Sequence, residues 1–402
     1  MDLNRLLANA VAHGASDLHL KVGSYPMMRV NGSLVVASEE KRLDRGDTEA
    51  VAQSLLGPEQ RERFRRNQDV DLAYSVDGLG RFRCNIFQQR GTVGLVLRVI
   101  PTRIRTVDEL GLPPFLKPIA QEERGLVLVT GTTGSGKSTT LAAMIDYINS
   151  TRQAHVITVE DPIEYLHRDN QCIVNQREIT VDTPTFAHAL RAALRQDPDV
   201  ILVGEMRDIE TVETALHAAE TGHLVFSTLH TLDATETINR IIAVFPPHQQ
   251  RQVRIQLAAV LKAAISQRLL PRADGQGRAA AVEVMISTAF IRDCIIDKDR
   301  TSMISGAIAA GTSQYGMQTF DQAIFGLYQQ GLVTLEEALR WASNVDDFKL
   351  KVQGISSTTD MAKDDMAGKL NPALKPGVAP AGHPRAQPAK PGGPTIERFG
   401  GR

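Results

Sequence analysis

The sequence predicts an α/β protein whose larger part is built on a parallel β-sheet and follows a smaller α+β part. Three observations support this prediction. From about residue 119 to 355, short apolar runs alternate with helical patterns at the spacing of βαβ units. Over residues 1–105, strand-like runs alternate with polar turns. Residues 356–402 contain seven prolines and seven glycines, a composition typical of a disordered tail.

The overall composition excludes several classes of protein. The 402-residue chain is 42% apolar and 23% charged, which is ordinary for a protein with a packed core and argues against wholesale disorder. Its formal net charge of −1 argues against nucleic acid as a partner. No apolar run approaches the ~20 residues of a membrane span, so we expect no direct membrane insertion. The three cysteines are far apart in sequence, and a reducing cytoplasm is the simplest compartment for them.

The N-terminal part, residues 1–105, is predicted to mix helices and strands. Helices are predicted over residues 3–12 and 47–64, and strands over residues 18–22, 28–30 and 94–100. Asn31-Gly32 lies between two strand-like runs and is a typical hairpin turn. Proline and charged residues are frequent between Pro101 and Pro118, so we expect a linker over residues 106–118.

The larger part, residues 119–355, contains uninterrupted apolar runs, as expected for a parallel sheet covered on both faces. Strands are predicted over residues 125–130, 155–159, 200–203 and 224–228. Helices are predicted near the end of this part, over residues 319–330 and 334–343. Because strand ends in a parallel sheet open onto the ligand crevice, the polar residues that follow these runs are candidates for a site.

Residues 131–138 match the phosphate-binding pattern G-x-x-x-x-G-K-[ST], between a predicted strand and a predicted helix. Glycines let the backbone curl so that its N–H groups face anionic oxygens, and the start of the following helix adds positive charge. Lys137 would reach the β- and γ-phosphates of ATP, and the Ser138 hydroxyl would hold Mg²⁺. The expected nucleotide-binding residues are Gly131, Thr132, Thr133, Gly134, Ser135, Gly136, Lys137, Ser138 and Thr139. The alternative is a glycine-rich turn that only ends a strand.

Carboxylates follow two of the apolar runs. Glu205 is the expected Mg²⁺ partner or water-orienting group, although the commoner arrangement has an aspartate one position earlier, where Gly204 stands here. Glu160, Asp161 and Glu164 form a second acidic group, in which Glu164 is the expected general base for attack by water. A solvated acidic loop is the alternative interpretation of this second group.

Two histidines flank the last of the four apolar runs. His223 precedes it, whereas Thr228 and His230 close it. We expect Thr228 and His230 to reach the same crevice, where they could sense the γ-phosphate or polarise the transferred group. The alternative is that these histidines are structural residues whose hydrogen bonds are satisfied.

Four ordered motifs and an N-terminal signature carry a family resemblance. The motifs are GTTGSGKS (131–138), VEDPIEY (159–165), DPDVILVGEMRD (197–208) and TGHLVFSTLHT (221–231). The signature comprises GASDLHL (14–20), RVNG (29–32) and GRFRCNIFQQR (80–90). Over roughly residues 1–353 the chain resembles the type IV pilus retraction ATPases of the PilT/PilU family, within the secretion ATPase superfamily.

The resemblance implies a PAS-like N-terminal domain joined to a RecA-like P-loop ATPase domain. It implies a homohexameric ring in which the N-terminal domain of each subunit packs on its neighbour's ATPase domain. It also implies Mg²⁺-dependent ATP hydrolysis that powers pilus retraction and twitching motility. An inner-membrane pilus platform protein is the implied partner, so the expected location is the cytoplasm, peripheral to the inner membrane at the pilus base.

The resemblance also assigns roles to residues. Arg83 and Arg98 would reach the nucleotide across the subunit interface and neutralise the charge of the transferring phosphoryl group. Glu205 would be the Walker B glutamate. The remaining assigned positions are the acidic residues Glu160, Asp161 and Glu164 and the residues Thr228, His223 and His230.

Two features bear on the subfamily. The chain lacks the four-cysteine motif and the long extra N-terminal region of pilus assembly and type II secretion ATPases, which favours the retraction side. The second feature is the stretch Ala289–Ile296, where retraction ATPases carry an AIRNLIR-like helix, but here the arginine is shifted and the second one is missing. A PilU-like accessory subunit that modulates a paralogous retraction ATPase therefore stays an alternative, as does an ATPase for secretion or DNA uptake.

Overall fold

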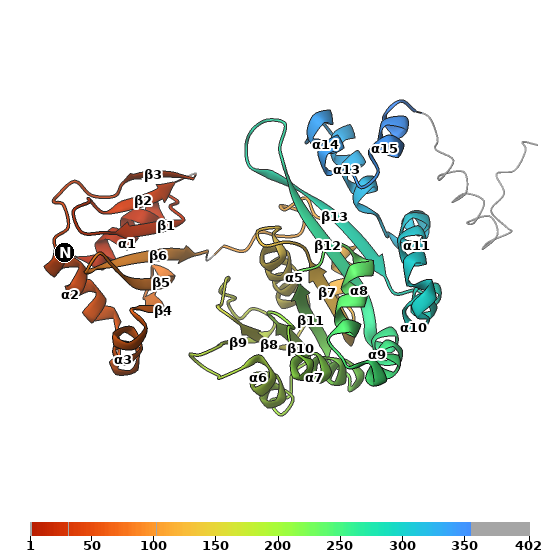
Figure 1. Ribbon diagram of the computed structural model, residues 1–402, viewed down its shortest axis with the longest axis horizontal. Coiled ribbons are helices and arrows are strands. Elements are labelled where there is room, and N and C mark those ends of the chain that lie inside the picture. The colour runs from red at the N-terminus through yellow and green to blue at the C-terminus, as the bar shows by residue number, and fades with distance from the viewer. Residues whose placement is uncertain (1, 31, 102, 355–402) are drawn as a thin grey trace, which may run out of the picture.

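The computed structural model describes residues 2–354 except Asn31 and Thr102, and it contains two β-sheets (Figure 1). The predicted disordered tail, residues 356–402, lies outside the described residues. Within the described part, no helix has both the length and the apolar composition needed to cross a bilayer.

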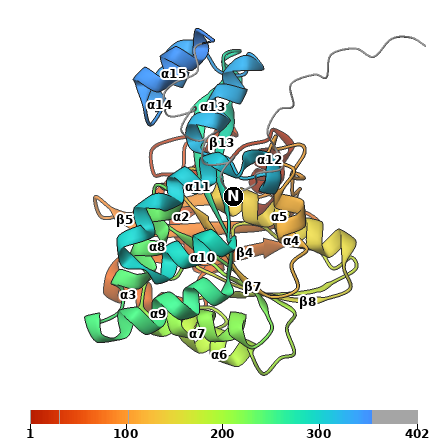
Figure 2. The same cartoon turned by 90° about the vertical axis from the view of Figure 1, so that its right-hand side faces the viewer.

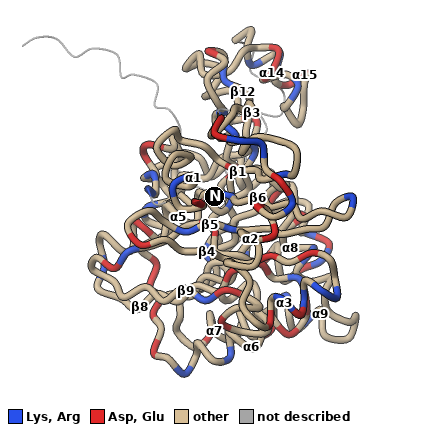
Figure 3. Tube along the Cα trace, turned by 90° about the vertical axis from the view of Figure 1, so that its left-hand side faces the viewer, with Lys and Arg blue, Asp and Glu red and all other residues tan. Residues whose placement is uncertain are grey.

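The first sheet belongs to the N-terminal part and is antiparallel, with strand order β3-β2-β1-β6-β5-β4. Its elements are α1 (Leu3–Ala12), β1 (Asp17–Leu20), β2 (Met27–Val30), β3 (Ser33–Val36), α2 (Arg45–Leu55), α3 (Pro58–Asn67), β4 (Asp69–Val76), β5 (Gly80–Gln89) and β6 (Thr92–Ile100). Helices α1 and α2 contribute Leu7 and Val51 to a core that also contains Phe82 and Leu97 of the sheet. On the side seen in Figure 3, Lys and Arg are interspersed with Asp and Glu.

The helix predicted over residues 3–12 is confirmed, but the one predicted over residues 47–64 is two helices. The chain breaks at Leu56 and Gly57, and Pro58 opens α3 as its first residue. Proline lacks the backbone N–H that a continuing helix would need, so it favours a helix start over a helix interior.

The second sheet has the order β13-β12-β7-β11-β10-β8-β9. Strands β7 (Gly125–Thr130), β11 (Leu224–Leu229), β10 (Val200–Val203), β8 (His155–Glu160) and β9 (Ile173–Glu178) are parallel neighbours in that order. Strand β12 (Leu261–Pro271) pairs parallel with β7 and antiparallel with β13 (Arg278–Ile286). The strands predicted in this part are confirmed, whereas β9, β12 and β13 were not predicted.

Alternate residues of the central strands face opposite sides of the sheet. Leu126 and Leu128 pack with helices α7 (Ile209–Glu220), α8 (Ala234–Ala243) and α9 (Pro247–Val260), together with α10 (Ala289–Ile296). Val127 and Val129 pack with α4 (Leu116–Ala120) and α5 (Lys137–Thr151) on the other side (Figure 2). Val107, Leu112 and Leu116 from the chain before β7 are buried in this second cluster. Burial on both faces explains why these strands are continuous apolar runs.

The order of the strands creates a crevice. Along the chain, β7 is followed by β8, which lies on the far side of β11 and β10 in the sheet. After the edge strand β9, the chain comes back to form β10 and then β11, next to β7. The carboxyl ends of these four parallel strands share one sheet edge, at a point where the strand order reverses. The two loops that follow β7 and β8 therefore stand on opposite sides of the ends of β11 and β10. Helix α6 (Phe186–Ala193) precedes β10.

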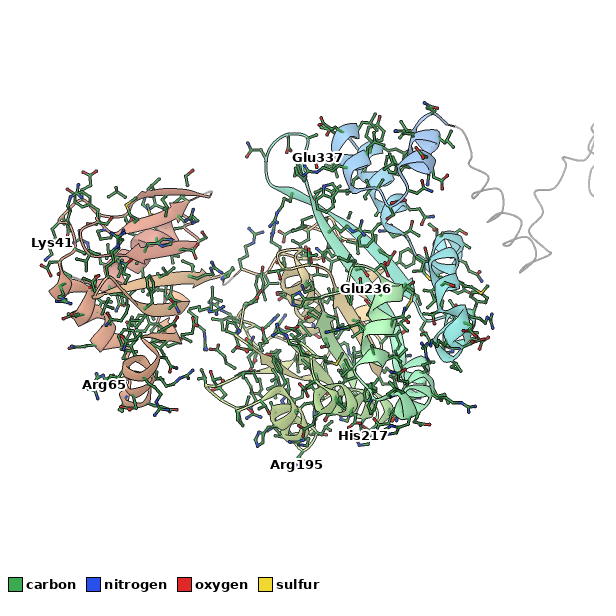
Figure 4. The ribbon with its side chains drawn as sticks, viewed as in Figure 1. Lys41, Arg65, Arg195, His217, Glu236 and Glu337 are labelled. Carbon is green, nitrogen blue, oxygen red and sulfur yellow. The ribbon has the colours of Figure 1, made fainter. Side chains whose placement is uncertain are left out.

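The C-terminal helices form two groups. The first group is η1 (Lys298–Met303), α11 (Ile304–Ala310) and α12 (Thr312–Tyr315), of which α11 is buried in the same cluster as α8 and α10. The second group, α13 (Phe320–Gln329), α14 (Leu335–Trp341) and α15 (Val345–Val352), covers the far end of the β12–β13 hairpin. Phe320 and Phe348 pack against Leu270 and Ala281 of the hairpin. The Trp341 indole nitrogen donates a hydrogen bond to Glu337 of α14 at 3.1 Å (Figure 4). The two helices predicted here are confirmed, with Thr319 and Thr334 as their N-caps.

Glu283 of β13 is a buried acid outside the cleft formed at the strand ends. Its side chain accepts a hydrogen bond from the backbone nitrogen of Ala234 at 2.9 Å, at the start of α8. The residue is 6% exposed, and burial raises its pKa from 4.5 to about 7. The folded protein thus holds a proton that the unfolded chain releases between these two pH values. The free energy of unfolding must therefore fall as the pH rises through this window.

We expect Glu283→Gln to stabilise the fold at pH 8 by about 3 kcal/mol, the free energy that corresponds to this pKa shift. Glutamine keeps an acceptor for the Ala234 N–H but carries no charge to bury. Thermal unfolding of wild type and variant at pH 5 and pH 8 measures this, and the gap in Tm should be wider at pH 8. A gap that does not change with pH would contradict the assignment.

Candidate active site

The loop between β7 and α5 requires glycine at several positions. Gly134 and Gly136 have φ angles of 77° and 94°, a region that residues with a side chain rarely adopt. A Cβ on Gly131 would lie 2.5 Å from the Gln267 carbonyl oxygen, and one on Gly136 would lie 2.8 Å from the Gln267 side-chain nitrogen. The loop therefore curls tightly against β12, as a phosphate-binding loop does.

Lys137 begins α5 and points back over this loop. Its Nζ donates hydrogen bonds to the carbonyl oxygens of Gly131 at 2.8 Å and Thr132 at 3.1 Å. Burial lowers the pKa of Lys137, while the carboxylates of Glu205 and Glu164 act in the opposite direction. The lysine is thus within electrostatic reach of both acids that the sequence singled out.

A cleft of 640 Å³ lies between the loop and the carboxyl ends of β8, β10 and β11. Predicted site residues that line it are Thr133, Gly134, Gly136, Lys137, Ser138, Thr139, Glu160, Asp161, Glu164, Glu205, Thr228 and His230. The other three predicted loop residues line a second cavity of 440 Å³ beside the loop. They are Gly131, Thr132 and Ser135. The structure thus brings most of the predicted residues to one place.

Glu205 is held in a fixed orientation at the end of β10. Its Oε1 lies 2.6 Å from Nε of Arg207 and 3.5 Å from Nε2 of His230. Gly204 fits closely, since a Cβ there would lie 3.2 Å from the Val159 carbonyl oxygen. The Thr228 hydroxyl donates to the Gly204 carbonyl at 2.6 Å. Thr228 and His230 thus support the backbone and side chain of the Glu205 segment as well as lining the cleft.

The acids at the end of β8 and in the loop after it divide into two kinds. Glu160 accepts hydrogen bonds from the Thr158 hydroxyl at 2.7 Å and from Gln176 at 3.2 Å, and burial raises its pKa. Its second oxygen accepts from the backbone nitrogen of Glu164 at 3.4 Å. Asp161 and Glu164 themselves are exposed and line the cleft. Glu160 therefore anchors the loop, and Glu164 is free to meet a ligand.

The prediction for His223 is wrong. His223 precedes β11, and its carbonyl oxygen accepts from the Gly125 nitrogen at 3.0 Å, at the amino end of β7. The phosphate-binding loop follows the carboxyl end of β7, about 20 Å away at the rise of a six-residue strand. The His223 ring instead contacts the Ala218 carbonyl at 2.9 Å, as the structural alternative expects.

Arg83 and Arg98 do not line the cleft of their own chain. They are direct cross-strand partners on β5 and β6. Nε of Arg83 lies 3.5 Å from Asp71, and Nε of Arg98 lies 2.8 Å from Asp17. Burial opposes ionisation of Asp17, but hydrogen bonds from Arg98 and Ser16 hold its pKa below the ordinary value.

Several residues at the cleft were not predicted, among them four with polar side chains that bear on the site. Arg207 pairs with Glu205, and Arg278 donates to the Gly134 carbonyl oxygen at 3.2 Å. The Tyr165 hydroxyl lies 2.8 Å from the hydroxyl of Thr139. His167 lines the cleft, and burial lowers its pKa to about 4, so the ring is neutral at physiological pH. Arg207 and Tyr165 lie within the recognised motifs, whereas no sequence signal links Arg278 to the loop.

A phosphate-binding loop that faces carboxylates at the end of a parallel sheet defines a P-loop nucleoside triphosphatase. Residues 1–309 match the Type II/IV secretion system protein family, and the chain belongs to this family. It is a secretion ATPase of the PilT/PilU type.

Two curated relatives and one solved structure illustrate the likeness. The chain is 47% identical over 348 residues to the type IV pilus retraction ATPase PilT of Pseudomonas aeruginosa, covering 87% of this chain and 100% of the relative. It is 43% identical over 361 residues to the type IV pilus ATPase PilU of the same organism, covering 90% and 94%. The crystal structure of the pilus retraction motor PilT with bound ADP superposes with a TM-score of 0.79 at 47% identity, covering 86% of this chain and 98% of that one. The predicted α/β fold class is confirmed.

Proposed function

We propose that this chain is the ATP-hydrolysing subunit of a motor that retracts type IV pili. The observation that carries the proposal is Lys137, which closes a phosphate-binding loop and lies within electrostatic reach of Glu164 and Glu205. The PilT relative is a type IV pilus retraction ATPase, and this likeness supplies the biological role. The cleft supplies the chemistry, because its residue types are those that phosphoryl transfer needs.

The residues present fit a Mg²⁺–nucleotide complex. The glycines leave the loop open on its outer side, with nothing within 4 Å of a Cβ placed on Gly134. Among the described residues no cluster of three or more His, Cys, Asp or Glu could hold a metal by itself. That suits Mg²⁺ at a nucleotide, which is bound by few protein ligands and by phosphate oxygens. Ser138 and Glu205 would hold it, and when bound it would neutralise charge on the β- and γ-phosphates.

Glu164 and Glu205 would have different roles in the attack of water on the γ-phosphate. Glu164 is exposed in the cleft and would orient or deprotonate the attacking water as general base. Glu205 is already paired with Arg207 and His230, so it would hold its position rather than accept a proton. Lys137 and the loop amides would keep the phosphates in place during transfer.

A neighbouring cavity of 680 Å³ would take the base and ribose. It shares Gly136 and Thr139 with the cleft and is lined on the far side by Leu110 and Leu112. Leu269 of β12 adds an apolar wall. Since residues 110 and 112 precede the second sheet, the segment that joins the two sheets would contact the nucleotide.

We further propose a homohexamer in which Arg83 and Arg98 reach the nucleotide when two domains close. Both side chains are partly exposed and pair with Asp71 and Asp17 in this structure. Guanidinium groups would neutralise charge that develops on the phosphoryl group. An inner-membrane pilus platform protein and a paralogous retraction ATPase are the proposed partners, and the cytoplasmic face of the inner membrane at the pilus base is the proposed location.

Mixed oligomers test which subunit supplies these arginines. If they act across the interface, mixing Lys137→Ala and Arg83→Ala subunits should restore part of the ATPase activity that each variant lacks alone. Some sites would then combine an intact loop with an intact arginine from the neighbour. The measurement is the steady-state rate as a function of mixing ratio. Activity that stays at the level of the separate variants would show that each chain uses its own arginines.

One observation favours a second candidate function, a PilU-like accessory subunit. Helix α10 exposes Arg292, Asp293 and Ile296, in place of the pattern expected of an autonomous retraction motor. A host that carries type IV pili but lacks its retraction ATPases separates the two functions. The motor proposal expects this chain alone to restore twitching motility. Restoration only beside an active PilT-type partner would support the accessory role.

A further inference from the structure

One ion pair links the N-terminal sheet to the ATPase part of the same chain. Nη2 of Arg81, on β5, lies 2.9 Å from Oε2 of Glu178, at the end of β9. The side chains of Arg81 and Glu178 are only 19% and 9% exposed. Figure 4 shows side chains of both parts in the space between the β5 and β9 ribbons. This pair is thus far more enclosed than the surface pairs of the N-terminal part.

The same carboxylate oxygen also holds the loop that carries Glu164. Oε2 of Glu178 accepts a hydrogen bond from the backbone nitrogen of Ile163 at 3.3 Å. Ile163 is the residue immediately before Glu164 and is itself buried. Glu178 is in register with Glu160, whose side chain contacts the Glu164 nitrogen. Two neighbouring carboxylates therefore fix consecutive backbone nitrogens of this loop, and one of the two depends on Arg81.

A buried carboxylate is stable only with a charged partner or several hydrogen bonds. Among residues 2–354 that the structure describes, Arg81 is the cation paired with Glu178, and it comes from the other part of the chain. If the N-terminal part moves away from β9, Arg81 no longer contacts Glu178. The Glu178 carboxylate then keeps its hydrogen bond from the Ile163 nitrogen but loses the guanidinium that balances its charge. The loop would then relax, and Glu164 would move relative to the phosphates. Displacement by about 1 Å is enough to lower a catalytic rate about a hundredfold.

We propose that Arg81 and Glu178 are positioning residues that make the placement of Glu164 depend on the position of the N-terminal sheet. This inference rests on the proposed ATPase function. It makes the rate of ATP hydrolysis depend on the position of the N-terminal sheet relative to the ATPase part. Neither residue lines the nucleotide cleft, so neither is placed to bind the phosphates. The pair acts on the rate of hydrolysis and leaves nucleotide affinity unchanged.

The test uses Arg81→Gln, Arg81→Lys and Glu178→Gln in the full chain. Arg81→Gln and Glu178→Gln are expected to lower kcat about ten- to a hundredfold, with KM for ATP and Kd for a fluorescent ATP analogue within about twofold of wild type. Arg81→Lys should recover part of kcat, because it restores the charge. The double variant should be no worse than the more affected single variant, since both changes remove one interaction. Arg5→Gln, which breaks the exposed 3.1 Å pair with Glu40, is the matched control and should leave kcat unchanged.

Several outcomes would overturn the inference. An unchanged kcat in Arg81→Gln would do so, as would a change confined to KM and Kd. Additive losses in the double variant would show that the two residues act separately. If Glu178→Gln does not fold, the Arg81 variants still decide the question. Absence of hydrolysis in the wild type would contradict the proposed function instead, and the two failures are therefore distinguishable.

Discussion

Replacing Lys137 with alanine is expected to weaken ATP binding at least a hundredfold and to abolish hydrolysis. The Lys137 Nζ carries the positive charge of the phosphate-binding loop and lies 2.8 Å from the Gly131 carbonyl oxygen. Lys137 is buried. A buried charged donor contributes more than an exposed one, and the loss of about 3 kcal/mol corresponds to about a hundredfold in affinity. Titration of a fluorescent ATP analogue measures this effect directly.

Lys41→Ala is the matched control for this change. It removes the same side chain from the N-terminal surface, where Lys41 pairs with Asp47 at 2.8 Å (Figure 4). We expect wild-type affinity for nucleotide in that variant. If Lys137→Ala binds ATP as tightly as Lys41→Ala does, then the loop is only a turn that ends β7, and the nucleotide site must be sought elsewhere.

The second large effect is expected for Glu205→Gln, which should separate binding from hydrolysis. The carboxylate is held by Arg207 and His230, so the amide can occupy nearly the same place without the charge. Loss of one preorganised electrostatic group typically lowers kcat by about 10²- to 10³-fold. Nucleotide affinity should change little, because Lys137 and the loop amides remain. Single-turnover hydrolysis, combined with the binding titration, measures both quantities.

Glu213→Gln serves as the control for the charge change, since Glu213 is exposed on α7, the helix that follows the Glu205 segment. It should hydrolyse ATP at the wild-type rate. A Glu205→Gln protein that hydrolyses within about threefold of wild type would rule out Glu205 as an electrostatic contributor. It would also leave Glu164 as the acid that organises the reaction.

The phosphate-binding loop could be predicted from sequence because its constraints are local. An apolar strand, a glycine-rich turn and a helix start are adjacent in the chain, and each limits the backbone of the next. The error for His223 was also avoidable from local information. His223 precedes its strand while Thr228 ends it, and in a parallel sheet those positions lie at opposite edges.

Other features depend on contacts that no local pattern announces. Arg278 reaches the loop because β12 and β13 form a long hairpin beside it, and the hairpin was not predicted. Arg81 and Glu178 are 97 residues apart and belong to different sheets. The break between α2 and α3 was marked by Gly57 and Pro58, but the helical pattern on both sides concealed it.

Global similarity does not decide between the two retraction-type roles. The identities to PilT and PilU, 47% and 43%, are too close to separate a motor from an accessory subunit. The departure from the retraction-type pattern lies on α10, where Arg292 and Ile296 are exposed. Surface residues that contact partners contribute little to the fold, so fold-level likeness carries little information about them.

The steady-state ATPase rate of the purified wild-type chain, compared with that of Glu205→Gln, decides whether this protein is a motor. The mass of each assembly is determined alongside. We expect both proteins to form the same hexamer and to bind ATP, and only the wild type to hydrolyse it. A wild-type hexamer that binds ATP but hydrolyses it no faster than Glu205→Gln would contradict the motor function.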